Sequence, residues 1–301
     1  MATIFNEVDS NKRKSLLILG VFIALVTLMG YVFGVVSGNG DSLLILAFLF
    51  SVVTSFASFY YSGQIVLAIS GAREVPEAEN PELHHLVENI CIGAGLPKPK
   101  VYMINDTAMN AFATGRDPQH AVVCFTSGIV SKLNRTELEG VVAHELSHVK
   151  NYDIRYMALV SVMAGMVTLL ADWFLRNLWW GRGRRNNDRE SGQIGAILLI
   201  VAIVLAVLSP IFAMLVQFAI SRRREFLADA SGVLITRYPE GLASALEKLA
   251  ADKEPLEAAN RATEPLYIVN PFYGKEVGGW LTGLFNTHPP LSERIKILRS
   301  M

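Results

Sequence analysis

Two histidines separated by three residues form the pattern with the clearest chemistry in this chain, His144-Glu145-Leu146-Ser147-His148. In a helix, positions four apart lie on the same face, so both imidazoles can reach one metal ion. The intervening Glu145 faces the same cleft, where a carboxylate can act as a general base. Two such ligands with this base are typical of a zinc hydrolase, although the same pattern also occurs by chance on unrelated helices.

A catalytic zinc ion needs three protein ligands and one open position. The residues directly after His148 contain no further histidine, so the third ligand must come from elsewhere in the chain. Glu225 and Asp229 lie four positions apart and therefore share one helical face. We expect Glu225 to bind the metal and Asp229 to accept a hydrogen bond from a ligand histidine, which would fix the tautomer of that ring. The alternative is a basic patch beside the membrane, residues 222–224, whose charge the two acidic residues neutralise.

Three more polar residues are candidates for the site. His288, in Thr-His-Pro-Pro, could donate a hydrogen bond to a developing oxyanion, or be an ordinary loop residue. Arg294 could pair with an acidic group near the site, or be a surface charge on a helix. Asn110 begins a predicted strand and could hydrogen-bond a peptide lying along its edge, or be a turn residue.

The composition of the chain indicates a membrane protein. Of its 301 residues 51% are hydrophobic and only 18% are charged, whereas soluble domains average about 25% charged residues. The apolar residues are concentrated in long stretches. The net charge is zero and no basic run alternates with aromatic residues, so nothing favours nucleic-acid binding. Cys91 and Cys124 lack metal-ligand spacing, and we expect buried thiols in a reducing compartment.

The N-terminal region contains two stretches long enough to cross a bilayer as helices, residues 15–36 and 42–72. Lys12-Arg13-Lys14 precedes the first stretch, and the link between the two has no Lys or Arg. The positive-inside rule therefore predicts that the N-terminus and everything after the second span lie in the cytoplasm.

A soluble region follows. It begins with a predicted amphipathic helix, residues 81–95, that buries Leu83, Leu86, Val87 and Ile90. Strands are expected at residues 100–104, 111–114 and 121–125, with hairpin-turn residues 115–118 between the last two. Thr136 and Glu139 match a capping box, which predicts the start of the helix that carries the histidine pair. Val141, Val142, Leu146 and Val149 should face the core.

A second apolar region precedes the final part of the chain. Residues 156–171 are short for a span, residues 191–221 are long, and five arginines lie between them. Either a hairpin or two spans returns the chain to the same side of the membrane, where helices are expected at residues 240–251 and 291–298. The predicted parts are a two-helix anchor (1–72), a catalytic domain in two segments (73–155 and 222–301), and this apolar insertion (156–221).

Taken together, these motifs resemble the HtpX-type membrane zinc endopeptidases, which are related to the prenyl-protein (CAAX) endopeptidases. The resemblance covers nearly the whole chain: the two N-terminal spans, Asn110-Ala111-Phe112-Ala113, the histidine pair, Glu225 with Asp229, and His288 with Arg294. It implies an α-helical membrane protein with an α+β, gluzincin-like zincin domain, mostly helix with a small sheet. It also implies a multi-pass protein of a bacterial-type inner membrane, whose catalytic domain faces the cytoplasm.

The same resemblance implies one Zn²⁺ per chain, bound by His144, His148 and Glu225, with Glu145 as the base. His288 becomes a transition-state stabiliser, and Asn110, Ala111, Phe112 and Ala113 become a strand that binds substrate. The implied partners are the bilayer and misfolded or damaged proteins, cleaved in protein quality control.

The expected reaction is peptide hydrolysis, in which Glu145 takes a proton from the attacking water and passes it to the leaving amine. One alternative is a protease that trims prenylated C-termini, but a chamber for such substrates would need more spans than the four candidate segments. The other is a non-catalytic metal site. Structural zinc sites are usually closed and rich in cysteine, and neither cysteine belongs to this cluster.

Overall fold

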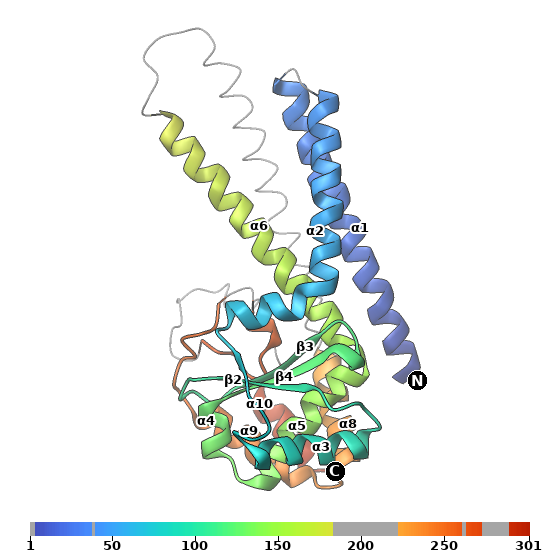
Figure 1. Ribbon diagram of the computed structural model, residues 1–301. Helices are drawn as coiled ribbons and strands as arrows, with labels where there is room; N and C mark the ends of the chain where they lie inside the picture. The colour runs from blue at the N-terminus through green and yellow to red at the C-terminus, as the bar shows by residue number, and fades with distance from the viewer. Residues whose placement is uncertain (1–3, 38–39, 183–221, 261–262, 273–288) are drawn as a thin grey trace.

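Three long helices extend away from a smaller unit that holds the β-sheet (Figure 1). The computed structural model describes residues 4–37, 40–182, 222–260, 263–272 and 289–301. The long helices are α1 (Ile4–Ser37), α2 (Gly40–Ile69) and α6 (Asp153–Arg182). The lower parts of α1 and α6 pack through a small apolar cluster formed by Ile18, Phe22, Tyr156, Val160 and Met163.

Helix α2 has the properties of a membrane span. Among the described helices, its segment Asp41–Ile69 is the one long and apolar enough to cross a bilayer. Its large apolar side chains are widely exposed, among them Ile45, Leu46, Phe50, Val53 and Phe56. Such a surface is expected against lipid tails rather than water. The first predicted span falls within α1, and residues 156–171 fall within α6, which continues unbroken past Asp172.

The strands form a mixed four-stranded sheet in the order β1-β2-β4-β3. They are β1 (Arg73–Glu74), β2 (Lys100–Ile104), β3 (Ala111–Gly115) and β4 (Ala121–Thr126). Strand β4 is parallel to β2 and antiparallel to β3, with Phe112 opposite Cys124. The three predicted strands and the hairpin are therefore confirmed, and a 3-10 turn at Pro118–His120 completes the connection. Strand β3 is an edge of this sheet.

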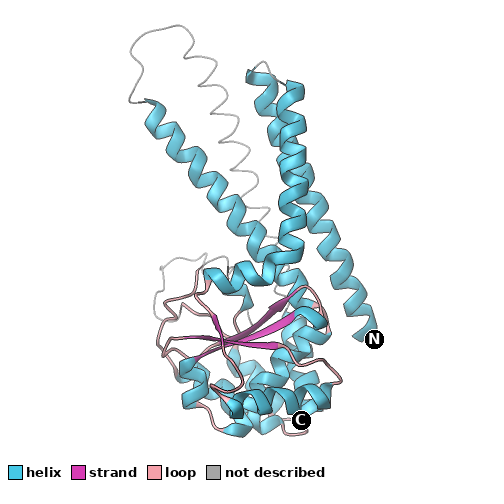
Figure 2. Cartoon of the chain, in the orientation of Figure 1, coloured by secondary structure: helices cyan, strands magenta, loops and turns pink. Residues whose placement is uncertain are grey.

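Helices pack beneath the sheet, on the side away from the long helices (Figure 2). They are α3 (Pro81–Ala94), α4 (Ser127–Lys132), α5 (Arg135–Lys150), α8 (Arg222–Thr236), α9 (Pro239–Ala251) and α10 (Leu291–Leu298). Helix α5 contacts α3, α8, α9 and β3, so it runs through the middle of this unit. The residues predicted to face the core of α3 and α5 are all buried, and so are both free cysteines.

The predicted start of α5 needs a correction. The helix begins two residues earlier than the Thr136–Glu139 pattern indicates, because Asn134 is the cap and Glu137 completes the capping box. The side-chain oxygen of Asn134 accepts from the Glu137 N–H at 2.9 Å, and the Glu137 carboxylate accepts from the Asn134 N–H at 2.8 Å. Glu139 instead forms an exposed ion pair with Arg135.

Candidate metal centre

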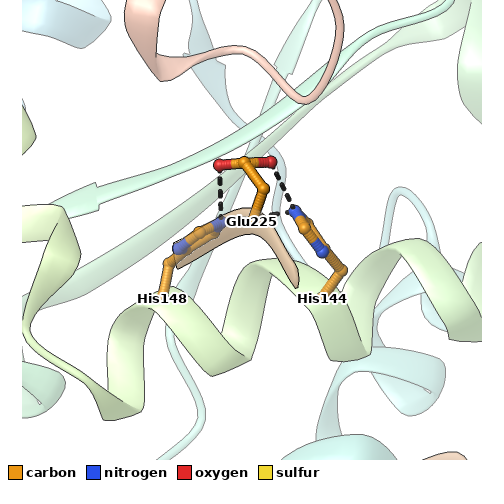
Figure 3. Close-up of side chains that lie close together, drawn as sticks. All are labelled: His144, His148 and Glu225. Atoms are coloured by element: carbon orange, nitrogen blue, oxygen red, sulfur yellow. Dashed lines mark hydrogen bonds and ion pairs between the residues drawn. The ribbon is translucent and has the colours of Figure 1, made fainter. Parts of the chain in front are cut away.

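Three buried side chains from two helices converge on one point (Figure 3). His144 and His148 project from α5, and Glu225 reaches them from α8. The two Nε2 atoms lie 3.2 Å apart, and the Glu225 carboxylate oxygens lie 3.6 and 3.7 Å from the Nε2 atoms of His144 and His148. Tetrahedral ligands at zinc bond lengths are separated by about 3.3 Å, so this spacing fits a zinc ion. Two imidazoles and one carboxylate supply three of the four ligands that a tetrahedral zinc ion takes.

The second nitrogen of each imidazole binds a carboxylate. His144 Nδ1 lies 2.9 Å from Asp229 Oδ1, and His148 Nδ1 lies 3.0 Å from Asp153 Oδ2. A carboxylate accepts a hydrogen bond from Nδ1–H, which leaves the lone pair of a neutral ring on Nε2. When the two rings are neutral, both lone pairs would therefore face Glu225, as ligation of one metal requires.

Arg294 connects α10 to this cluster. Its guanidinium binds Asp229 through two hydrogen bonds of 2.7 and 2.8 Å, and its Nη1 lies 3.3 Å from Glu225. The side chain is completely buried. A buried guanidinium offsets the repulsion between two buried carboxylates and fixes both by its fork geometry. The predicted pairing of Arg294 with an acidic group is thus what the structure shows.

A glycine lets the two ligand helices approach closely. A Cβ atom placed on Gly232 of α8 would lie 3.1 Å from the backbone nitrogen of His144. This is tighter than nine in ten Cβ contacts, so a larger residue would require α8 and α5 to separate by a few tenths of an ångström. Such a displacement would carry Glu225 and Asp229, which lie on the same helix, away from the histidines.

Glu145 is buried beside the ligands. Burial raises the pKa of its carboxyl to about 7, although the charge of His148 opposes the rise. The nearby backbone N–H of Ala113 in β3 also favours the ionised form of this carboxyl. Thr126 N donates to Asn110 O, so the backbone of residues 111 and 113 faces away from β4. The carboxylate therefore lies where the outer edge of β3 meets the histidine pair.

The charges around the cluster shift the pKa values of the ligand histidines in opposite directions. For His144, burial and the charge of Arg294 lower the pKa despite the bond to Asp229. For His148, burial also opposes protonation, but the hydrogen bond to Asp153 and the charge of Glu225 outweigh it and raise the pKa to about 9. Arg294 and His144 hold the pKa of Asp229 below its usual range, so this carboxylate is ionised and available as an acceptor.

The predicted substrate strand is partly covered by a later segment of the chain. Asn110 is buried, and its amide nitrogen donates to the carbonyl of Val269 at 3.1 Å. The Ala111 carbonyl accepts from the N–H of Ile268 at 3.0 Å. In this structure the Asn110 amide therefore bonds within the chain. The backbone at Ala113 lies beyond that cover and faces Glu145.

One predicted site residue lies outside the described part of the chain, and one observed site residue was not predicted. His288 lies outside the described residues, so its role stays a prediction. Asp153, the partner of His148, was not identified. Its position five residues after His148 is the sequence signal that points to it.

Comparisons with known proteins identify the family. Residues 77–301, which include every described residue of the cluster, match peptidase family M48. The chain belongs to peptidase family M48. A protease HtpX homologue from Dictyoglomus turgidum is 46% identical over 301 residues, covering 99% of this chain and 95% of its own. One from Ligilactobacillus salivarius is 41% identical and covers 99% and 100%.

The resemblance found in the sequence motifs is thus confirmed, and the chain is a membrane-associated metalloendopeptidase. Among solved structures, Ste24p of S. mikatae matches with a TM-score of 0.52 at 20% identity, over 98% of this chain and 67% of that one. At this level of identity the likeness shows the fold. The M48 fold here is mostly helical with a small mixed sheet, as predicted.

Proposed function

We propose that this M48 peptidase hydrolyses peptide bonds with one zinc ion held by His144, His148 and Glu225. The observation that carries the proposal is the buried triangle of two Nε2 atoms and a carboxylate, with each Nδ1 already bonded to an acid. A zinc ion bound there supplies Lewis-acid chemistry, polarising the substrate carbonyl and making water more acidic.

The side chains around the proposed zinc position have separate roles in the reaction. Glu145 takes a proton from the attacking water and passes it to the leaving amine, a task that suits a buried carboxylate beside the ligands. Asp229 and Asp153 hold the two imidazoles in one tautomer and orientation. Arg294 fixes Asp229 and lies beside Glu225. His288 remains a proposed donor to the developing oxyanion.

The outer edge of β3 is proposed to bind substrate. An extended peptide pairs readily with an open strand edge, and residues 111 and 113 present their backbone on that side. A peptide alongside Ala113 would pass Glu145, whose carboxyl lies near the backbone of Ala113. Asn110 and Phe112 belong to this strand. At this edge the Ala111 carbonyl already accepts from Ile268, and all five residues of β3 are buried. A substrate would therefore pair with Ala113 only after this edge is uncovered.

The proposed substrates are misfolded or damaged proteins of a bacterial-type inner membrane, cleaved in protein quality control. The protein would be multi-pass, with its catalytic unit in the cytoplasm. The exposed apolar surface of α2 supports the membrane location. The basic residues before the apolar stretch of α1 support a cytoplasmic N-terminus by the positive-inside rule.

The test is cleavage of unfolded casein by the detergent-purified protein beside its Glu145→Gln variant. We expect the wild type to cut casein in a zinc-dependent way. Glu145→Gln should lose activity by about 10²–10⁴-fold, the usual contribution of a general base, while keeping its metal. Glu139→Gln, a change on the exposed face of the same helix, is the matched control and should cleave normally. Full activity in Glu145→Gln would contradict the assignment.

A further inference from the structure

A side chain of α1 contacts the catalytic unit next to the metal ligands. The amide nitrogen of Asn11 donates to Asp153 Oδ1 at 2.7 Å and to the backbone carbonyl of Asn151 at 3.0 Å. Asn11 is fully buried. Both acceptors lie where α5 ends and α6 begins. One residue from the N-terminal helix therefore bridges the two sides of the turn that joins them.

That turn contains a strained residue. Tyr152 has φ = 60°, in the left-handed region that bulky side chains rarely adopt. Such a conformation persists only where the surrounding contacts enforce it. Asn11 binds the residues on both sides of Tyr152. The Lys12 ammonium lies 4.5 Å from the centre of the Tyr152 ring, a cation–π distance. Two consecutive residues of α1 thus hold the turn.

The α5–α6 turn also positions Asp153, whose carboxylate orients the proposed ligand His148. Asp153 uses Oδ1 for Asn11 and Oδ2 for His148 Nδ1. Arg224 also approaches Oδ1, at 3.8 Å. Because the carboxylate is held at one oxygen by α1, its other oxygen is fixed in direction toward the imidazole. A continuous chain of three buried side chains connects α1 with the metal centre.

We infer that α1 is a structural part of the metal centre, with Asn11 as a positioning residue for His148. Asn11 and Lys12 keep the α5–α6 turn in its strained conformation, and this conformation places Asp153 against the ligand. Movement of α1 away from the catalytic unit therefore weakens metal binding. The inference rests on the proposed metal site and adds to it a coupling between the N-terminal helix and that site.

The experiment compares metal affinity in variants of the full chain in detergent. The metal-stripped protein is titrated with Co²⁺, whose visible spectrum reports ligand geometry, and the Kd is obtained by chelator competition. Loss of a residue that orients a metal ligand usually weakens binding by about 10–100-fold. Asn11 acts one hydrogen bond further from the ligand, through Asp153. We expect Asn11→Ala to raise the Kd by about tenfold, at the lower end of that range, and to alter the Co²⁺ spectrum.

Ser15→Ala is the matched control. Ser15 is buried one turn further along α1, and its hydroxyl donates to the Asn11 carbonyl within the helix. Its Kd and spectrum should equal those of the wild type. If Asn11→Ala does not yield folded protein, Asn11→Ser, which is too short to bridge both acceptors, takes its place in the same comparison.

A second variant tests the strain directly. Glycine adopts the left-handed conformation at little cost. With Tyr152→Gly the turn therefore no longer depends on the contacts of Asn11 and Lys12. We expect Tyr152→Gly, added to Asn11→Ala, to recover part of the lost Co²⁺ affinity. A merely structural defect elsewhere in α1 would not be rescued by a change in the turn.

The outcomes separate this inference from the proposed function. If the wild type binds one Co²⁺ per chain and Asn11→Ala binds it with the same Kd and spectrum, the coupling is wrong and the metal site stands. If the wild type binds no Co²⁺, or His148→Ala binds it equally well, the metal site itself is wrong and the coupling fails with it.

Discussion

At the scale of single residues, the proposed metal centre is defined by which ligand atoms already have hydrogen-bond partners. Each ligand imidazole gives one nitrogen to an acid, Asp229 or Asp153, and turns the other toward Glu225. Arg294 is the cation that makes this dense group of carboxylates tolerable in a buried position. The geometry of the site therefore depends on the residues that bind the proposed ligands as much as on the ligands themselves.

The role of Arg294 leads to a prediction about stability. Arg294→Met should lower the unfolding free energy of the metal-free protein by about 3–5 kcal/mol, because it leaves Asp229 and Glu225 buried without their cation. Arg299→Met removes an exposed pair with Glu240 and Glu247 near the end of the same helix, and should cost at most about 1 kcal/mol. Thermal unfolding in detergent, followed by tryptophan fluorescence, measures both. Equal unfolding midpoints for the two variants would contradict the account.

The grouping of the proposed ligands could be predicted from the sequence because their relations are local. His144 and His148 are four positions apart, and Glu225 and Asp229 repeat that spacing, so helical periodicity alone puts each pair on one face. Asn11 could not be found this way, since it meets Asp153 across 142 positions of the chain. No local pattern distinguishes that asparagine from any other polar residue near a membrane helix.

At the scale of elements, α5 carries the site and its start depends on a cap. Two overlapping patterns, Asn134 with Glu137 and Thr136 with Glu139, both resemble a capping box. The structure uses the first, because Glu137 also accepts from Lys248 at 2.7 Å and from Ser244 at 2.8 Å, both on α9. A contact with a later helix decides between the two, which is why the sequence pattern gave the wrong start.

A pair of alanine variants checks this assignment. Asn134→Ala removes the acceptor for the first turn of α5 and should lower the unfolding free energy by about 1 kcal/mol. Thr136→Ala should have little effect, since its hydroxyl bonds only the exposed Asn134 side chain. The reverse order of the two thermal midpoints would restore the cap that the sequence pattern indicated.

The same cap predicts how stability depends on pH. Burial opposes ionisation of Glu137, but the bonds from Lys248, Asn134 and Ser244 outweigh it and hold its pKa below the usual range. A carboxyl with a lowered folded-state pKa stabilises the protein above its unfolded pKa of about 4.3, and loses that contribution as the pH falls through the folded value. The difference in unfolding midpoint between the wild type and Glu137→Gln should therefore be constant above about pH 5 and shrink below about pH 4. A difference that grows on acidification would show that Glu137 is not held ionised.

At the scale of the whole molecule, α1, α2 and α6 rise from the unit that carries the metal centre (Figure 1). The sequence predicted the apolar stretches, since their length and composition are direct consequences of the bilayer. It did not predict that α6 runs on from the metal-ligand helix through one tight turn, or that α1 reaches down to that turn. Both follow from packing between distant segments. Helix α1 and the proposed metal centre are consequently packed together as one structure.

The central claim is that His144, His148 and Glu225 bind one zinc ion, and metal content tests it most directly. Detergent-purified wild type, Glu145→Gln, His148→Ala and Glu225→Ala would be dialysed against limiting zinc and measured by mass spectrometry for metal per chain. We predict about one zinc in the wild type and in Glu145→Gln, and far less in the two ligand variants, in keeping with three protein ligands at a catalytic zinc. Full zinc content in Glu225→Ala would contradict the claim and require a different third ligand.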